Sequence, residues 1–351
     1  MRFNRVLKYL SSTAITAVAI SACQKSPDNP TGNAVSNPSS NSTDCRTVQH
    51  TMGETEICGN SQKVVAVGPA ALEALLIMDI QPVGFADHFP VHQGSYDNPS
   101  QQIPYVGDRI TLPIANIGIS SNPSLEAIFQ LQPDFILGDR LTLDQYNAFS
   151  EIAPTLPLEL SESEANLMAV AQAVDLTERA EEILIEAEQK VAAARRNFAP
   201  FVASNPKVLL LSAFDLQNMF LANSAHGTCR SVVEEVGFQL VAPPEFDNIN
   251  SDVQLPISIE ALPQLNEADL VIMLGANFNP PEQANNLEPF EDYQLSDIEK
   301  SWKENAIAQS LDASKAGRVY FIPAYLCLGL PGPIGTELYL DELQEQLLPL
   351  D

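Results

Sequence analysis

The stretch Ser124-Leu-Glu-Ala-Ile-Phe-Gln-Leu-Gln-Pro-Asp-Phe-Ile-Leu137 combines a helical pattern with a strand pattern, which indicates an α/β fold. Asn122-Pro123 is typical of a helix start, and the spacing predicts a helix that runs to about Gln132. The apolar run 134–138 predicts a short buried strand. A related stretch, Ser258-Ile-Glu-Ala-Leu-Pro-Gln-Leu265 and then Asp269-Leu-Val-Ile272, recurs later. The recurrence favours two related lobes, although ordinary αβ composition could also produce it.

Strands and helices alternate along both halves of the chain. Buried strands are predicted at 64–67, 82–86, 155–160, 208–213, 219–222, 268–274 and 318–322. Further helices are predicted at 69–78, 143–152, 228–236 and 335–348. This alternation predicts βαβ units around a parallel sheet in each half. Between the halves, residues 161–197 contain neither Gly nor Pro, which predicts long helices, one of them from Thr177 to about Phe198.

Acidic residues strongly outnumber basic residues. The 351 residues include 45 Asp and Glu against 18 Lys and Arg, for a formal net charge of −27. Nucleic-acid binding, and attachment to an anionic lipid surface through basic patches, both need clustered Lys and Arg. The composition therefore excludes these two classes. The hydrophobic content of 45% fits a folded protein with sizeable cores, and the length favours two domains.

The first 44 residues are predicted to be a targeting segment followed by a tether. Three basic residues among the first eight precede a mostly apolar stretch, 9–20, and Ser21-Ala22-Cys23 closes it. This is the layout of a secretory signal. The cysteine after Ser-Ala resembles a bacterial lipobox, in which Cys23 becomes the lipidated first residue; the alternative is an ordinary signal peptide cut near Ala22. Residues 24–44 are rich in Ser, Asn and Pro, which is typical of a flexible tether.

The five cysteines fit an exported chain with one lipid anchor and two disulfides. With Cys23 lipidated, Cys45, Cys58, Cys229 and Cys327 remain, and four cysteines allow three pairings. The segment between Cys45 and Cys58 contains a turn signal, Met52-Gly53-Glu54, and a hairpin can bring its two ends within bridging distance. We therefore favour the pairs Cys45–Cys58 and Cys229–Cys327.

Together these features resemble the substrate-binding proteins of ABC importers, in the class that binds ferric siderophores, haem or cobalamin. The resemblance covers nearly all of residues 45–350, and its most specific parts are Val106-Gly107-Asp108-Arg109 and the stretch around Glu126. It implies two Rossmann-like α/β lobes joined by a single long backbone helix, with the ligand cleft between the lobes. The implied organisation is a signal peptide (1–22), a tether (23–44), an N-terminal lobe (45–174), a connecting helix (175–200) and a C-terminal lobe (201–351).

The resemblance also implies a docking role for two carboxylates. Glu126 and Glu260 match the glutamates, one in each lobe, that face arginines of the membrane permease in this family. Without the resemblance, each would simply be a favourable negative charge in the first turn of a helix.

Ligand-binding residues are expected among the scarce cations and the aromatic side chains, because ferric siderophores are rich in oxygen and often anionic. Arg109 stands where similar binders place a ligand-contacting Arg, with a surface salt bridge as the alternative, and Tyr325 stands where relatives carry an aromatic residue. Arg140 follows the strand 134–138, and ligands of open α/β sheets bind beyond the carboxyl ends of strands. Arg230 begins a helix of the second lobe, where a position in the cleft and an exposed position are equally open.

We therefore expect a lipid-anchored, monomeric, non-enzymatic protein on the extracytoplasmic side of the cell envelope. It would capture an Fe(III)–siderophore of the ferric citrate or hydroxamate type, without a covalent cofactor, and deliver it to an ABC permease dimer with its ATPase subunits. The alternatives are a cobalamin or haem carrier, a binding or sensor lipoprotein without a permease, and a lipoprotein hydrolase. No nucleophile elbow or nucleotide-binding Gly motif is present. No metal site is predicted, since Pro90 separates His88 from His92 and argues against a regular helix.

Overall fold

The computed structural model describes residues 45–89, 91–159, 161–223, 226–243, 254–277 and 290–348. All of them belong to one folded unit, Thr43–Asp351. The predicted signal peptide, the tether and Cys23 lie outside the described residues. Within the described ranges, no helix is long and apolar enough to cross a membrane.

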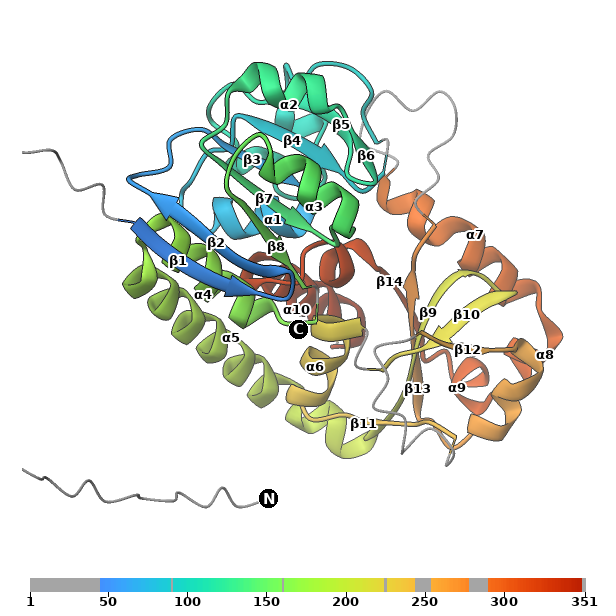
Figure 1. Ribbon diagram of the computed structural model, residues 1–351. Helices are drawn as coiled ribbons and strands as arrows, with labels where there is room; N and C mark the ends of the chain where they lie inside the picture. The colour runs from blue at the N-terminus through green and yellow to red at the C-terminus, as the bar shows by residue number, and fades with distance from the viewer. Residues whose placement is uncertain are drawn as a thin grey trace, which may run out of the picture. The chain divides into compact units, whose positions relative to one another are not determined.

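The N-terminal lobe is built on a six-stranded sheet with the order β6-β5-β4-β3-β7-β8 (Figure 1). Its strands run parallel except β6, which is antiparallel to β5. Every residue of β3, β4, β7 and β8 is buried, as expected for parallel strands that are covered on both faces. The bounds are β3 (Val64–Val67), β4 (Gly84–Asp87), β5 (Ala115–Ile119), β6 (Asn122–Pro123), β7 (Phe135–Asp139) and β8 (Thr155–Leu158).

The helices of this lobe are α1 (Pro69–Leu76), α2 (Leu125–Leu131) and α3 (Leu143–Ser150). Pro69 lies in the first turn of α1, where its missing N–H costs no helical hydrogen bond. Helix α2 begins later than the sequence predicts, because Asn122-Pro123 forms the short strand β6 instead. The side chain of Ser124 caps α2 by accepting a hydrogen bond from the N–H of Ala127.

The C-terminal lobe is built on a second sheet with the order β12-β10-β9-β13-β14, and β11 pairs with β9. Strands β9, β13 and β14 are parallel, whereas β10 and β12 are antiparallel to their neighbours. This lobe comprises β9 (Lys207–Asp215), β10 (Asn218–Leu221), α6 (Gly227–Glu235), β11 (Gln239–Leu240), β12 (Leu255–Ile257), β13 (Leu270–Gly275), α7 (Phe290–Glu304), α8 (Ala306–Ser310), α9 (Asp312–Lys315) and β14 (Val319–Pro323). The prediction of a parallel α/β sheet in each half is confirmed.

Two long helices, α4 (Ser163–Val174) and α5 (Thr177–Ser204), follow the first sheet, and α5 leads into the second. Helix α5 has 28 residues, about 42 Å at 1.5 Å per residue. It packs against α4, α6 and the last helix, α10 (Pro333–Leu347), as Figure 1 shows. It extends to Ser204, beyond the predicted ends at Phe198 and residue 200. Pro200 removes only one backbone N–H from the helix, and the carbonyl that loses its donor is that of the exposed residue Arg196. The boundaries at 174 and 200 remain predictions.

The second Glu-containing stretch has a different backbone from the first. Residues Ile259–Leu265 form a 3-10 helix, although the sequence recurrence suggests a counterpart of α2. Pro263 lies inside this segment, and in an α-helix its ring would collide with the carbonyl of Ile259. Glu126 and Glu260 therefore both lie in the first turn of a helix, although the two helices are of different types.

Two disulfides are present in the pairing that the sequence favours. Cys45 and Cys58 face each other at the open end of a hairpin made by β1 (Cys45–His50) and β2 (Gly53–Cys58). Cys229 and Cys327 are both buried, and their bond joins α6 to the short π-helix Tyr325–Gly329, which precedes α10. The second disulfide closes a sequence separation of 98 residues, so it restricts the unfolded chain strongly.

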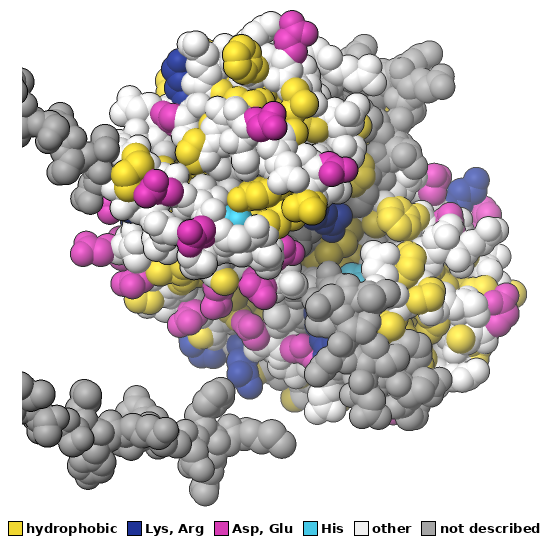
Figure 2. Space-filling view, in the orientation of Figure 1, with side chains coloured by type: hydrophobic (Ala, Val, Ile, Leu, Met, Phe, Trp, Pro, Cys, Tyr) yellow, Lys and Arg dark blue, Asp and Glu magenta, His cyan; other side chains and the backbone are white. Residues whose placement is uncertain are grey.

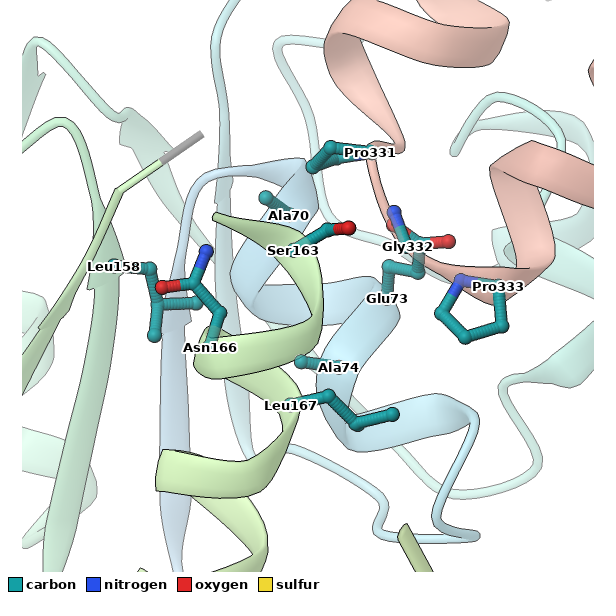
Figure 3. A pocket seen from close by; sticks show the side chains of 10 residues that line it. All are labelled: Ala70, Glu73, Ala74, Leu158, Ser163, Asn166, Leu167, Pro331, Gly332 and Pro333. Atoms are coloured by element: carbon teal, nitrogen blue, oxygen red, sulfur yellow. The ribbon is translucent and has the colours of Figure 1, made fainter. Parts of the chain in front are cut away.

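A buried carboxylate connects the first lobe to the start of α10. Glu73 of α1 accepts hydrogen bonds from the N–H groups of Gly332 (2.7 Å) and Gly335 (2.8 Å). Burial raises the pKa of Glu73 to about 7, although these backbone donors oppose the shift. Figure 3 shows the Glu73 side chain beside Gly332 and Pro333, at a small pocket that side chains of α4 also line. Helix α1 belongs to the N-terminal lobe, whereas α10 follows the last strand of the C-terminal lobe. The contact therefore helps to fix the position of one lobe relative to the other.

We expect Glu73→Ala to lower the free energy of unfolding by about 2–4 kcal/mol, because it leaves two buried N–H groups without an acceptor and opens a small cavity. Urea unfolding of the folded chain measures this change. Glu186→Ala on the exposed face of α5 is the matched control and should change the free energy by less than about 0.5 kcal/mol. Equal effects of the two substitutions would contradict the structural role of Glu73.

Candidate ligand-binding site between the lobes

The carboxyl ends of the parallel strands in the N-terminal lobe meet at one edge of the sheet. Strand β4 ends at Asp87 and β7 ends at Asp139, and Arg140 follows directly. This edge faces the C-terminal lobe, because the hydroxyl of Tyr325 donates a hydrogen bond to the carboxylate of Asp87 (3.1 and 3.2 Å). Figure 2 shows a hollow between the two lobes, with basic, histidine and hydrophobic side chains gathered along its walls. Strand ends of this kind are where ligands bind in α/β proteins.

Asp139 organises this edge through two hydrogen bonds. Its Oδ2 accepts the N–H of Ala70 (2.9 Å) at the start of α1, and its Oδ1 lies 2.6 Å from Nε2 of His88. The side chain of Asp139 is fully buried. Gly68 makes room for it, because a Cβ at residue 68 would lie 2.1 Å from Oδ1, and the φ of +103° at this position also favours glycine. The carboxylate therefore fixes the orientation of the His88 ring.

Asp87 is the second buried carboxylate of the edge. It accepts the backbone N–H of His88 (2.6 Å) in addition to the hydroxyl of Tyr325. Burial raises the pKa of Asp87 to about 6, while the neighbouring His88 and the hydrogen bonds partly oppose that rise. This carboxylate therefore changes charge in a physiologically relevant range, in direct contact with the other lobe.

The structure places Tyr325 at the contact between the lobes. Its side chain is 1% exposed, and its ring packs against the rings of Tyr105 and Phe290. Its backbone N–H donates to Oε1 of Gln294 (3.0 Å), and Nε2 of Gln294 donates to the hydroxyl of Tyr105 (3.3 Å). The ligand-binding role predicted for Tyr325 stays a prediction. In this structure its hydroxyl joins the C-terminal lobe to Asp87 of the N-terminal lobe.

The three arginines predicted to bind ligand lie in different surroundings. Arg140 is exposed at the strand edge, with a backbone φ of +52°, and forms no ion pair with any described residue. Arg230 on α6 is paired with Glu234 one turn later (3.0 Å). Arg109 lies near the opposite, amino edge of the sheet, where its carbonyl accepts a hydrogen bond from Gln81, just before β4 begins. The structure therefore brings Arg140, and not Arg109, to the edge that faces the second lobe.

His226, at the start of α6, is a candidate ligand-binding residue that the sequence pattern did not single out. The residue is 2% exposed, and its Nδ1 lies within 3.1 Å of the side-chain oxygen of Asn223. Its Nε2 has no hydrogen-bond partner among the described residues. Burial, and secondly the charge of Arg230, lower the pKa of His226 to about 4, so the ring is neutral at pH 7. Asp139 was also missed, although the end of a predicted strand is a signal that could have found it.

Glu126 and Glu260 both lie on the surface. Glu126 is in the first turn of α2, and its carboxylate accepts a hydrogen bond only from Gln130 among the described side chains (3.1 Å). Leu125 and Phe129 on the same helix are 46% and 69% exposed. Glu260 is exposed in the first turn of the 3-10 helix and has no ion pair within the described part of the chain. Both carboxylates are therefore accessible to a partner.

Comparisons with known proteins agree with this architecture. The sequence pattern of the family described as "Periplasmic binding protein" matches residues 64–326. The Fe(3+)-citrate-binding protein YfmC of Bacillus subtilis is 25% identical over 325 residues, 90% of this chain and 89% of that protein. The putative ABC transporter substrate-binding lipoprotein YhfQ of the same species is 22% identical, over 86% of this chain and 88% of that protein.

Solved structures share the fold. SirA of Staphylococcus aureus, complexed with staphyloferrin B, superposes with a TM-score of 0.67 at 22% identity, over 86% of this chain and 98% of SirA. FeuA of Bacillus subtilis, complexed with ferri-bacillibactin, gives a TM-score of 0.63 at 19% identity, over 86% of this chain and 98% of FeuA. The family resemblance and the two-lobed fold class predicted from the sequence are confirmed.

We expect Tyr325→Phe to lower the free energy of unfolding by about 1–3 kcal/mol at pH 8 and by less at pH 5. Burial makes ionisation of Asp87 unfavourable, so the free energy of unfolding falls as the pH rises towards about 6. The hydroxyl of Tyr325 offsets part of this fall, because it donates a hydrogen bond to the charged carboxylate of Asp87. The hydroxyl therefore contributes most above about pH 6. Urea unfolding at the two pH values measures the difference. Tyr293→Phe on α7 is the control, since the Tyr293 hydroxyl bonds to none of the described residues; an effect of Tyr325→Phe that does not depend on pH would refute the account.

Proposed function

The chain belongs to the periplasmic binding protein family, and from this premise we propose that it is the substrate-binding component of an ABC importer for an Fe(III)–siderophore. The observation that supports this most directly is the strand edge that faces the second lobe, where Arg140 is exposed and has no ion pair with a described residue. Several relatives and structural neighbours are named as binders of ferric citrate or siderophores. The cargo is an iron chelate taken up whole, so the protein itself needs no cofactor.

Capture of the chelate is a non-covalent step in this proposal. Arg140 lies beside the His88–Asp139 pair at the carboxyl edge, where its guanidinium can bind a carboxylate or another anionic oxygen in two-point geometry. Arg230 lies on α6 and His226 directly precedes this helix, so both can approach the same chelate from the other lobe. Tyr325 and Asp87 then keep the lobes in contact behind the bound chelate. No residue of this arrangement is required to act as a nucleophile or a general base.

Delivery of the chelate depends on docking to a permease dimer with its ATPase subunits. Glu126 and Glu260 are exposed carboxylates, one on each lobe, and complementary basic pockets on a permease could bind both at once. Since the two residues belong to different lobes, their spacing reports how the lobes are arranged. Lipidation of Cys23 would hold the monomeric protein at the membrane on the extracytoplasmic side, where the docking partner lies.

Arg140→Ala should weaken binding of the cognate ferric chelate by at least about tenfold, because a charge-assisted contact is lost. Isothermal titration calorimetry with ferric citrate, a ferric hydroxamate, cobalamin and haem measures this and identifies the ligand class. Calorimetry suits the protein because its one tryptophan, Trp302, is buried in the core of the C-terminal lobe. Arg109→Ala is the matched control, and the reverse order of effects would place the ligand contact at Arg109. Binding of cobalamin or haem alone would refute the iron proposal.

The double variant Glu126→Arg and Glu260→Arg should reduce uptake of the chelate at least tenfold in cells that depend on this protein, because like charges would then meet at the permease. Calorimetry on the same variant should give an unchanged affinity for the chelate. Glu186→Arg, on the exposed face of α5, is the control for a charge reversal elsewhere on the surface. Normal uptake by the double variant would show that these carboxylates do not dock the protein.

A further inference from the structure

His88 is held in a way that leaves one ring nitrogen available. Nε2 lies 2.6 Å from the buried carboxylate of Asp139, whereas Nδ1 has no hydrogen-bond partner in the described part of the chain. The side chain is 11% exposed, so the ring is fixed by its buried side and still reaches solvent. A histidine oriented by a carboxylate in this way is a typical arrangement where the other nitrogen binds a ligand.

The charges around His88 come from three parts of the fold. Asp87 precedes it at the end of β4, Asp139 and Arg140 lie at the end of β7, and the hydroxyl of Tyr325 reaches Asp87 from the C-terminal lobe. The neutral ring of Tyr96 also lies close enough for Asp87 to affect it. Burial, and to a smaller extent the charge of Arg140, would lower the pKa of His88. The charge and hydrogen bond of Asp139, together with the charge of Asp87, outweigh them, so the pKa of His88 is raised. His88 therefore stays protonated to a higher pH than an ordinary histidine.

We propose that His88, oriented by Asp139, is a ligand-binding cation that donates its Nδ1–H to a free carboxylate of the ferric chelate, beside Arg140. The site then selects carboxylate-bearing chelates over neutral hydroxamate chelates. This inference rests on the proposed function and names the substrate class of the same site. Arg140 and the free Nδ1–H of protonated His88 are charged donors to the carboxylates of a polycarboxylate chelate, whereas a neutral tris-hydroxamate complex has no free carboxylate to accept the Nδ1–H.

The affinity for a carboxylate chelate follows the charge of His88. Protonated imidazole donates from both nitrogens, whereas the neutral ring has a single N–H to share between Asp139 and the ligand. Affinity should therefore fall as the pH rises through the pKa of His88. Asp87 ionises at lower pH and adds a negative charge nearby, so both groups change affinity in the same direction, and only a His88 variant separates them.

The test compares the wild-type chain with His88→Gln and with His92→Gln as a matched control. His92 lies four residues later, and its Nε2 is engaged by the carbonyl of Ser95 (2.9 Å). Calorimetric titrations with ferric citrate and with a neutral ferric tris-hydroxamate are run from pH 5.5 to 8.5. Comparison of variant and wild type at each pH cancels changes in the chelate itself. Thermal unfolding of each variant without ligand identifies loss of folding.

We expect His88→Gln to weaken ferric citrate binding about tenfold at pH 6 and to reduce the pH dependence. Tris-hydroxamate binding, if present, should change less than about twofold, and His92→Gln should behave as wild type. Equal losses for both chelates, or an unchanged affinity for ferric citrate, would overturn the role of His88 while leaving the proposed function intact. If wild-type protein binds neither chelate, the proposed function fails and the inference fails with it.

Discussion

Two buried carboxylates of the N-terminal lobe, Glu73 and Asp87, accept hydrogen bonds from the C-terminal half of the chain. Glu73 binds the N–H groups at the start of α10, and Asp87 binds the hydroxyl of Tyr325. A carboxylate removed from water is costly unless donors surround it, so each is satisfied only when the two halves of the chain meet in this arrangement. The relative placement of the lobes therefore depends on these two side chains together with the continuous helix α5.

The same strand edge that makes the lobe contact also presents the candidate ligand-binding groups. Asp139 caps α1, orients His88 and directly precedes Arg140, and it fits only because residue 68 is glycine. Part of the acidic excess of the chain lies away from this edge. Three of the acidic residues line one hollow beside α5: Glu164, Glu188 and Glu235. An acidic protein can thus keep Arg140 exposed at one edge, with no ion pair among the described residues, where an anionic chelate would bind.

The two Glu-containing stretches resemble each other in sequence more than in local structure. Glu126 lies on a regular helix between exposed Leu125 and Phe129, whereas Glu260 lies on a 3-10 helix whose Leu262 is buried. Pro263 causes the difference in backbone. The two exposed carboxylates therefore share a charge and differ in their apolar surroundings, so a permease that binds both, as proposed above, would have to recognise them differently.

Local patterns in the sequence were sufficient for the class of fold, the long connecting helix and the family, because hydrophobic periodicity and Pro and Gly positions act over a few residues. The turn signal between Cys45 and Cys58 likewise predicted a hairpin that the structure contains. Only the tertiary structure decided which side chains share an edge. It separated Arg109 from Arg140, placed Tyr325 at the lobe contact and joined His88 to Asp139, 51 residues away. These pairings depend on the order of the strands in the sheet and on which charged side chains are buried. The pattern of residues along the sequence determines neither.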